Sequence, residues 1–180
     1  MNTGLMIELC IETPNLLIRN LNQNDLAAFH EYRWNPDIAK YQGFEVMDLE
    51  QVADFIRQQE NKLSIAFGEW KQYGIENRKT NKLVGDCALK VYDNGSTAEI
   101  GITISPLVQN KGYAKEAMEA IVQFLFGKKK VNLIEVIVDA ENFKAIRLVE
   151  SLGFKKENHQ TEKVFFKGNW GIEFHYKLEK

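Results

Sequence analysis

The chain has 180 residues, of which 27% are charged and 44% apolar, so it has the composition of an ordinary globular protein and the length of one domain. A net charge of -2 argues against nucleic acid or an acidic membrane surface as a main partner. Residues 1–14 lack a signal-peptide pattern and no window is apolar enough to cross a membrane, so we expect a cytoplasmic protein without a membrane partner.

The N-terminal half of the chain is predicted to contain strands and amphipathic helices. In chain order these are strand 16–21, helix 24–34, helix 47–59 and strands 69–77 and 82–93. Asn24 or Asp25 is the N-cap candidate of the first helix, and Asp48 is that of the second. Gln51 stands three residues after Asp48, which is the spacing of a capping box. The polar turn 78–82 predicts that the last two strands form a hairpin.

The C-terminal half is predicted to alternate strands and helices before a final hairpin. The elements are strand 96–105, helix 114–125, strand 132–140, helix 142–153 and strands 161–168 and 171–179. Gly127 and Gly153 are the expected stops of the two helices, and Asn142 lies near the start of the second. This order predicts an α/β or α+β domain with a mixed sheet.

The segment Gln109–Ala114 joins a strand to a helix, with Gly112 in the turn. Glycine allows the backbone to approach a ligand closely, and the first N–H groups of a helix lack intrahelical partners. Lys111 and Lys115 add positive charge nearby. The turn therefore suits a phosphate or pyrophosphate. It matches neither the dinucleotide-binding nor the Walker glycine pattern, and a plain connection between two elements is the alternative.

The surrounding sequence resembles the GNAT superfamily of N-acetyltransferases. Residues 98–118 look like the acyl-CoA-binding core of that superfamily, which is a strand, the motif Gln/Arg-x-x-Gly-x-Gly/Ala and a helix. The motif reads Gln109-Asn110-Lys111-Gly112-Tyr113-Ala114 here. Residues 138–154 resemble the family's strand, Asn-led helix and Leu-Gly-Phe ending.

Residues 167–176 are similar to the Gly-x-Trp-x-Asp/Glu segment of the ribosomal-protein-alanine acetyltransferase branch, the RimJ/RimL type. The likeness extends from Thr13 to the C-terminus, so we expect one GNAT domain over residues 1–180, with residues 1–12 as a candidate extension. The resemblance implies an α/β (α+β) GNAT fold. Its mixed sheet would have about six to seven strands, splayed at the middle, with about four helices.

The resemblance also implies acetyl-CoA as the cofactor. The backbone of Ile102, Thr103 and Ile104 would bind the pantetheine arm like an added strand, and one free N–H there would polarise the thioester carbonyl. The residues implied for the pyrophosphate are Gln109, Asn110, Lys111, Gly112, Tyr113, Ala114 and Lys115. Asn142 would contact the cofactor near its arm, and an ordinary helix N-cap is the alternative.

The chemistry requires a base, because an amine with a pKa near ~10.4 is protonated at neutral pH. Glu99 lies where many relatives carry a glutamate and is the implied base, with a surface carboxylate as the alternative. Relatives commonly protonate the leaving thiolate with the tyrosine of a Leu-Tyr-Glu pattern, where this chain has Val149. The acid role is therefore vacant, and Ser151 and Tyr176 are weak substitutes.

The acceptor wall is expected in the aromatic-rich segment 30–44, where Trp34, Tyr41 and Phe44 could line a pocket or simply pack in the core. The histidines and cysteines show no metal-ligand spacing, so no metal is expected. The protein would act as a monomer or homodimer.

Three functions stay open at this point. The first is acetylation of a primary amine by direct attack in a ternary complex, with a protein N-terminus as the candidate acceptor. The second is acetylation of a small amine such as an aminoglycoside or a polyamine. The third is a degenerate CoA-binding module without turnover; Val149 favours it and Glu99 argues against it.

Overall fold

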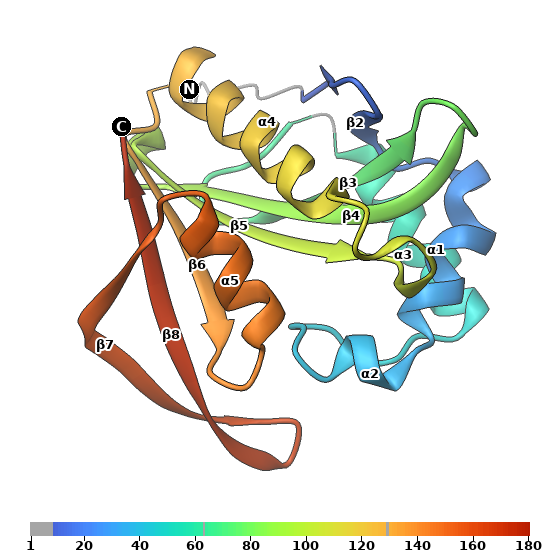
Figure 1. The fold of residues 1–180 in the computed structure, drawn as a ribbon. Helices are drawn as coiled ribbons and strands as arrows, with labels where there is room; N and C mark the ends of the chain where they lie inside the picture. The colour runs from blue at the N-terminus through green and yellow to red at the C-terminus, as the bar shows by residue number, and fades with distance from the viewer. Residues whose placement is uncertain (1–8, 63, 129) are drawn as a thin grey trace.

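The computed structural model describes residues 9–62, 64–128 and 130–180, which form one mixed sheet flanked by helices (Figure 1). The strands are β1 (Ile11–Glu12), β2 (Leu16–Asn20), β3 (Trp70–Asn77), β4 (Lys82–Tyr92), β5 (Thr97–Ile104), β6 (Leu133–Asp139), β7 (Lys155–Phe166) and β8 (Asn169–Glu179). The α-helices are α1 (Leu26–Arg33), α2 (Pro36–Ala39), α3 (Leu49–Asn61), α4 (Tyr113–Lys128) and α5 (Phe143–Ser151).

The sheet has eight strands in the order β1-β2-β3-β4-β5-β6-β8-β7, and β5 and β6 run parallel. These two strands pair over three residues only, ending at Glu99 opposite Glu135. By contrast, β5 stays paired with β4 as far as Ile104, and β6 stays paired with β8 as far as Asp139. The sheet therefore splays at its middle, as expected, and Figure 1 shows β5 and β6 diverging.

Two groups of helices cover the sheet. Helices α4 and α5 pack on one face, where Ile100, Ile134 and Val136 join their apolar residues in the main core (Figure 1). Helices α1 and α3 form a second cluster on the opposite face, in which Phe29 and Ile56 contact residues near β2 and β4. Strand side chains alternate between the two faces of a sheet. The pairing of β5 with β4 therefore shows which β5 side chains face α4 and α5 and which face the α1 and α3 side.

Local sequence signals explain most element boundaries. Asp48 accepts the backbone N–H of Gln51, and the Gln51 side chain accepts that of Asp48, which confirms the capping box of α3. Asp25 stands at the N-cap position of α1, as one of the two predicted candidates, but its side chain makes no capping hydrogen bond to that helix. Asn22 instead caps the 3₁₀ turn that precedes α1, in a capping box with Asp25.

The prediction of six to seven strands and four helices falls short of the eight strands and five helices that the structure describes. The additional elements are short: β1 has two residues and α2 has four, too few to give a hydrophobic period. Gly127 lies within α4 rather than after it. Gly153 follows α5 with a φ of 86°, as expected for a helix stop.

Candidate active site

Glu99 is the last residue of β5 that pairs with β6, so its side chain stands where the two strands begin to diverge. Its Oε2 lies 3.7 Å from Lys90 Nζ, and the side chain is 17% exposed. Burial raises the pKa of Glu99 above its ordinary value, and the positive charges of Lys90 and His175 oppose that shift. The result is a partly desolvated carboxylate, which binds a proton more strongly than a surface glutamate does.

The face on which Glu99 lies follows from the sheet register. Glu99 pairs with Lys90, and Thr103 pairs with Asp86, whereas Ile100 and Ile102 point toward the core under α4 and α5. Beyond Glu99, the β5 edge that faced β6 continues without ladder pairing to β6. Strand β5 therefore offers backbone donors and acceptors along Gly101–Ile104. The neighbouring Glu99 carboxylate points to the face of the sheet opposite α4 and α5.

Ile102, Thr103 and Ile104 were expected to hold the pantetheine arm, and they occupy this unpaired edge. Thr103 and Ile104 have buried side chains, so their backbone is the part available to a ligand. The carbonyl of Ile104 accepts a hydrogen bond from Gln109 Nε2 at 3.1 Å. Gln109 thus fixes the turn to the end of the strand.

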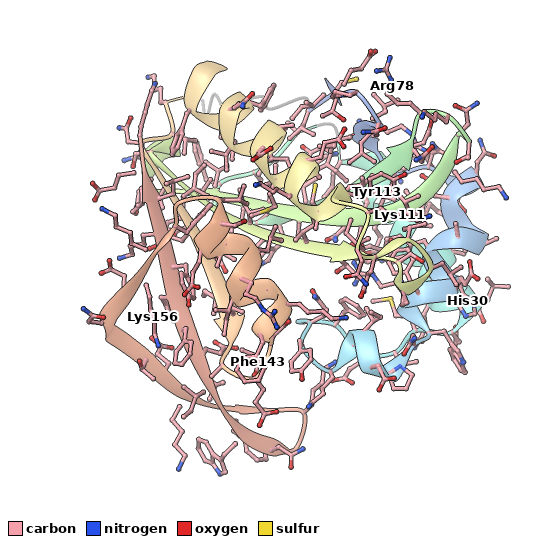
Figure 2. All side chains as sticks on the ribbon, in the orientation of Figure 1. His30, Arg78, Lys111, Tyr113, Phe143 and Lys156 are labelled. Carbon is pink, nitrogen blue, oxygen red and sulfur yellow. The ribbon has the colours of Figure 1, made fainter. Side chains whose placement is uncertain are left out.

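The turn before α4 has the backbone of an anion site. Asn110 and Gly112 have φ values of 63° and 81°, and α4 begins directly after Gly112. A Cβ built on Gly112 would meet no atom within 4 Å, so the space beside it is open. Figure 2 shows Lys111 and Tyr113 at this end of α4. Successive N–H groups in such a turn form a concave donor surface.

The side chains around this turn differ in what they can do. Tyr113 faces the sheet, where its hydroxyl accepts a hydrogen bond from Asn77 Nδ2 at 2.9 Å. Ala114 is half-buried against the core. Lys111 is exposed, and Lys115 Nζ lies 3.9 Å from Glu119 on the surface of α4. The two lysines are therefore the side chains that present positive charge to solvent.

Lys144 of α5 is a residue that the sequence analysis did not single out. Its Nζ donates a hydrogen bond to Gln109 Oε1 at 3.2 Å, which adds a third cation to the turn. No local sequence pattern could predict this contact, because Lys144 and Gln109 are 35 residues apart in the chain. Asn142 serves as the N-cap of α5, since its Oδ1 accepts the Ala145 N–H at 3.2 Å. Its amide nitrogen is the group that could donate to a cofactor.

The two candidate substitutes for the acid both donate hydrogen bonds within the protein. Tyr176 belongs to β8, on the far side of β6, and its hydroxyl donates to Glu150 Oε1 at 3.1 Å. Burial and this carboxylate raise the pKa of Tyr176 to about 12. Ser151 Oγ donates to the Leu148 carbonyl at 2.7 Å. Val149 is buried in the core, with 2% of its surface exposed, and its side chain has no proton to donate. That no residue acts as the acid stays a prediction.

The three aromatic residues expected in the acceptor wall each contact a different partner. Phe44 packs its ring 3.6 Å from the guanidinium of Arg33. Tyr41 is half-buried, and its hydroxyl accepts a hydrogen bond from Lys40 Nζ at 3.1 Å. Trp34 is 55% exposed and packs 5.6 Å from the ring of His30, which Figure 2 places on α1 at the edge of the molecule.

A group of carboxylates gathers around Glu173, on the same face of the sheet as Glu99. Desolvation raises the pKa of Glu173, and the negative charges of Glu162, Asp139 and Glu99 raise it further, while His175 lowers it. His175 Nε2 lies 3.9 Å from Glu162 Oε1. The groups come from β5, β6, β7 and β8, and on the same face Lys90 lies 3.7 Å from Glu99 and Lys177 lies 3.4 Å from Glu135.

Two negative findings concern the described residues as a whole. No helix in that part of the chain is long and apolar enough to cross a membrane. Within the same ranges, no group of three or more His, Cys, Asp or Glu residues is arranged to hold a metal ion.

The fold and the turn agree with the comparisons to known proteins. A family model described as an acetyltransferase (GNAT) domain matches residues 15–155, so the chain belongs to the GNAT family of acetyltransferases. The chain is 30% identical over 169 residues to the uncharacterised N-acetyltransferase YnaD of Bacillus subtilis, covering 93% of this chain and 95% of that protein.

Solved structures extend the comparison to proteins with named substrates. One is the spermidine N-acetyltransferase of Vibrio cholerae in complex with CoA and spermine, with a TM-score of 0.77, 23% identity and coverage of 93% and 96% of the two chains. Another is RimL, the ribosomal L7/L12 alpha-N-protein acetyltransferase in complex with CoA, with a TM-score of 0.80, 14% identity and coverage of 95% and 98%. The RimL-type resemblance is thus matched at the level of the fold.

The residues of this chain fit the CoA that those structures contain. The left-handed turn at Asn110 and Gly112 leaves open space beside the glycine, and Lys111, Lys115 and Lys144 supply positive charge for phosphates. The β5 edge beyond Glu99 offers backbone groups for an extended amide-bearing arm. The protein is an acetyl-CoA-dependent acyltransferase by family, and its acceptor amine is the open question.

Proposed function

We propose that the protein acetylates a primary amine by direct attack in a ternary complex, with Glu99 as the base. The observation that carries this proposal is the position of Glu99 at the last paired residue of β5 and β6. The unpaired edge of β5 and the turn at Gly112 serve the cofactor, and Glu99 points to the opposite face, where an amine can enter.

The proposed roles divide between binding and proton transfer. When bound, acetyl-CoA supplies the thioester carbonyl that the amine attacks. A backbone N–H of β5 beyond Glu99 would donate to the carbonyl oxygen. Glu99 would take the proton of the ammonium, directly or through water, because its raised pKa makes it a better base than an ordinary glutamate once it is ionised.

The acceptor is proposed to be a cationic amine. Glu173 lies close enough to Glu162, Asp139 and Glu99 for their negative charges to raise its pKa, and this group of carboxylates favours a polycation such as a small polyamine over a neutral acceptor. A protein N-terminus is the second candidate, because the fold resembles that of RimL. A module that binds CoA without turnover is a third, and the retained Glu99 argues against it. The proposed setting is the cytoplasm, as expected from the sequence.

The experiment is a screen for acetyl-CoA-dependent thiol release. The acceptors are peptides with varied N-termini, polyamines and aminoglycosides, and Glu99→Gln is tested beside the parent protein. The proposal predicts release with at least one amine and much slower release in the variant. Tight CoA binding with no release above the rate without acceptor would instead identify a binding module.

A further inference from the structure

The turn of the β7–β8 hairpin makes direct contact with the segment that follows α2. We call residues 39–46 the acceptor loop, because they include two of the expected acceptor-wall residues. Lys167 Nζ, from the hairpin turn, donates to the carbonyl of Ala39 at 2.6 Å and to the carbonyl of Phe44. It also lies 3.8 Å from Glu45. One ammonium group thus joins both ends of the acceptor loop.

The conformation of the hairpin turn does not explain why residue 167 is a lysine. Lys167 and Gly168 have φ values of 50° and 79°, and the paired residues Phe166 and Asn169 flank them. Two positive φ values in a two-residue hairpin are those of a type I′ turn, whose first position favours Asn, Asp or Gly. A lysine is strained there. Its two hydrogen bonds to the acceptor loop provide the compensating interaction.

The acceptor loop is also held from the sheet. The Phe44 ring packs on the Arg33 guanidinium, 3.6 Å away, and Arg33 Nη2 donates to both carboxylate oxygens of Asp86 at 2.6 and 2.8 Å. Asp86 is fully buried on β4 and stands opposite Thr103 of β5. The ring is therefore fixed, through two side chains, to the strand that adjoins the cofactor edge.

We propose that Lys167 and Arg33 are positioning residues for the amine acceptor, which together hold the acceptor loop in place. Lys167 fixes the loop backbone from the hairpin, and Arg33 fixes the Phe44 ring from the sheet. The inference rests on the proposed function, because it takes this loop as the acceptor wall. It assigns to the hairpin turn a role in acceptor affinity that leaves the cofactor turn unaffected.

The sharpest test is Lys167→Asn, because it separates the contact from the turn. Asn suits a positive φ, so the hairpin is expected to remain intact or become more stable. The acceptor loop, in contrast, loses two charge-assisted hydrogen bonds. We expect faster amide hydrogen exchange in residues 39–46 and a KM for the acceptor amine that is higher by at least roughly tenfold, since the loss of even one such hydrogen bond is worth about that factor. CoA affinity and kcat should stay within a factor of about two.

Lys163→Asn is the matched control. Lys163 lies on the same hairpin, is exposed and sits 5.2 Å from the ring of Trp170, so the variant loses the same charge without touching the acceptor loop. It should leave both the exchange of residues 39–46 and the acceptor KM unchanged. Phe44→Leu tests the contact from the sheet without disturbing the buried pair of Arg33 and Asp86, and it should also accelerate exchange in the loop.

The outcomes separate the two proposals. Unchanged exchange in Lys167→Asn would overturn the inference, whatever the activity. Faster exchange with an unchanged acceptor KM would show that the loop is held but does not position the acceptor, which also overturns it. If the parent protein acetylates no amine, the proposed function fails, and the exchange experiment still decides whether Lys167 holds the loop.

Discussion

The proposed cofactor side and the proposed acceptor side of this site are built in different ways. The cofactor turn is made of consecutive residues, from Gln109 to Lys115, and its shape depends on backbone angles at Asn110 and Gly112. The acceptor loop is held by side chains from elsewhere, including Lys167, which is 128 positions from Ala39. A turn of fixed shape suits a cofactor common to a family, whereas a loop held from a distance can change with the acceptor.

Glu99 joins the two sides, and its replacement should have the largest effect. Glu99→Gln keeps the shape of the side chain but removes its ability to accept a proton. We expect kcat to fall by ~10²–10⁴-fold, the usual contribution of a positioned base, with CoA affinity unchanged. Steady-state kinetics and calorimetry measure the two quantities. Glu60→Gln, on the exposed surface of α3, is the control and should behave as the parent does.

The cofactor side can be disrupted at a single backbone position. Gly112→Val places a branched side chain at a φ of 81° and in the open space beside the turn. Strain of ~1–3 kcal/mol at such an angle, together with the occupied space, should lower CoA affinity at least about tenfold. Calorimetry with CoA is the measurement. Gly127→Val, at a helical position in α4 where the added Cβ also meets no atom, should bind CoA normally.

The acceptor side has a buried anchor whose loss should appear as instability. Arg33→Met leaves the Asp86 carboxyl group in a fully buried site without its guanidinium partner, although the Tyr32 hydroxyl and Gln72 Nε2 still donate to it. Breaking such a pair typically lowers the free energy of unfolding by ~3–5 kcal/mol. Urea denaturation measures this loss. Arg57→Met removes an exposed pair with Asp54 and should change stability by less than about 1 kcal/mol.

Val149 offers a smaller and more ambiguous perturbation. Val149→Tyr would introduce a phenol where relatives carry one, but Val149 is 2% exposed in the core. Overpacking should cost roughly 1–3 kcal/mol of stability, which thermal denaturation would report. If the acid role is vacant in the parent, the rate profile should lack a descending limb in the tyrosine range. A descending limb that disappears in Tyr176→Phe or Ser151→Ala would show that an acid exists.

Local patterns in the sequence were sufficient to place the elements around the proposed cofactor turn, whereas its role in binding the cofactor was implied by the family resemblance. The strand before Gln109, the turn at Gly112 and the helix after it could be placed from composition and period, and the capping box at Asp48 and Gln51 was read directly. The splay of the sheet came from the family resemblance, since no local signal states where β5 stops pairing with β6.

The acceptor side could not be derived in the same way. The aromatic segment was noticed, but the sequence does not indicate that Phe44 packs on Arg33 or that Lys167 reaches its carbonyl. These contacts depend on how the β7–β8 hairpin folds toward α2. Tertiary packing of this kind produces no periodic pattern in the amino-acid sequence. Lys144 was missed for the same reason, because its partner Gln109 lies on another element.

The central claim is that Glu99 is the base, and its pH dependence tests the claim most directly. The measurement is kcat for the parent protein and Glu99→Gln, at saturating acetyl-CoA and amine, from acidic to alkaline pH. Because burial raises the pKa of Glu99, the parent should lose activity as pH falls through a value above the ordinary ~4.3 of glutamate. The variant should lack that ionisation and approach the parent only at high pH, where the amine is already free. Full activity of the variant at neutral pH would contradict the account.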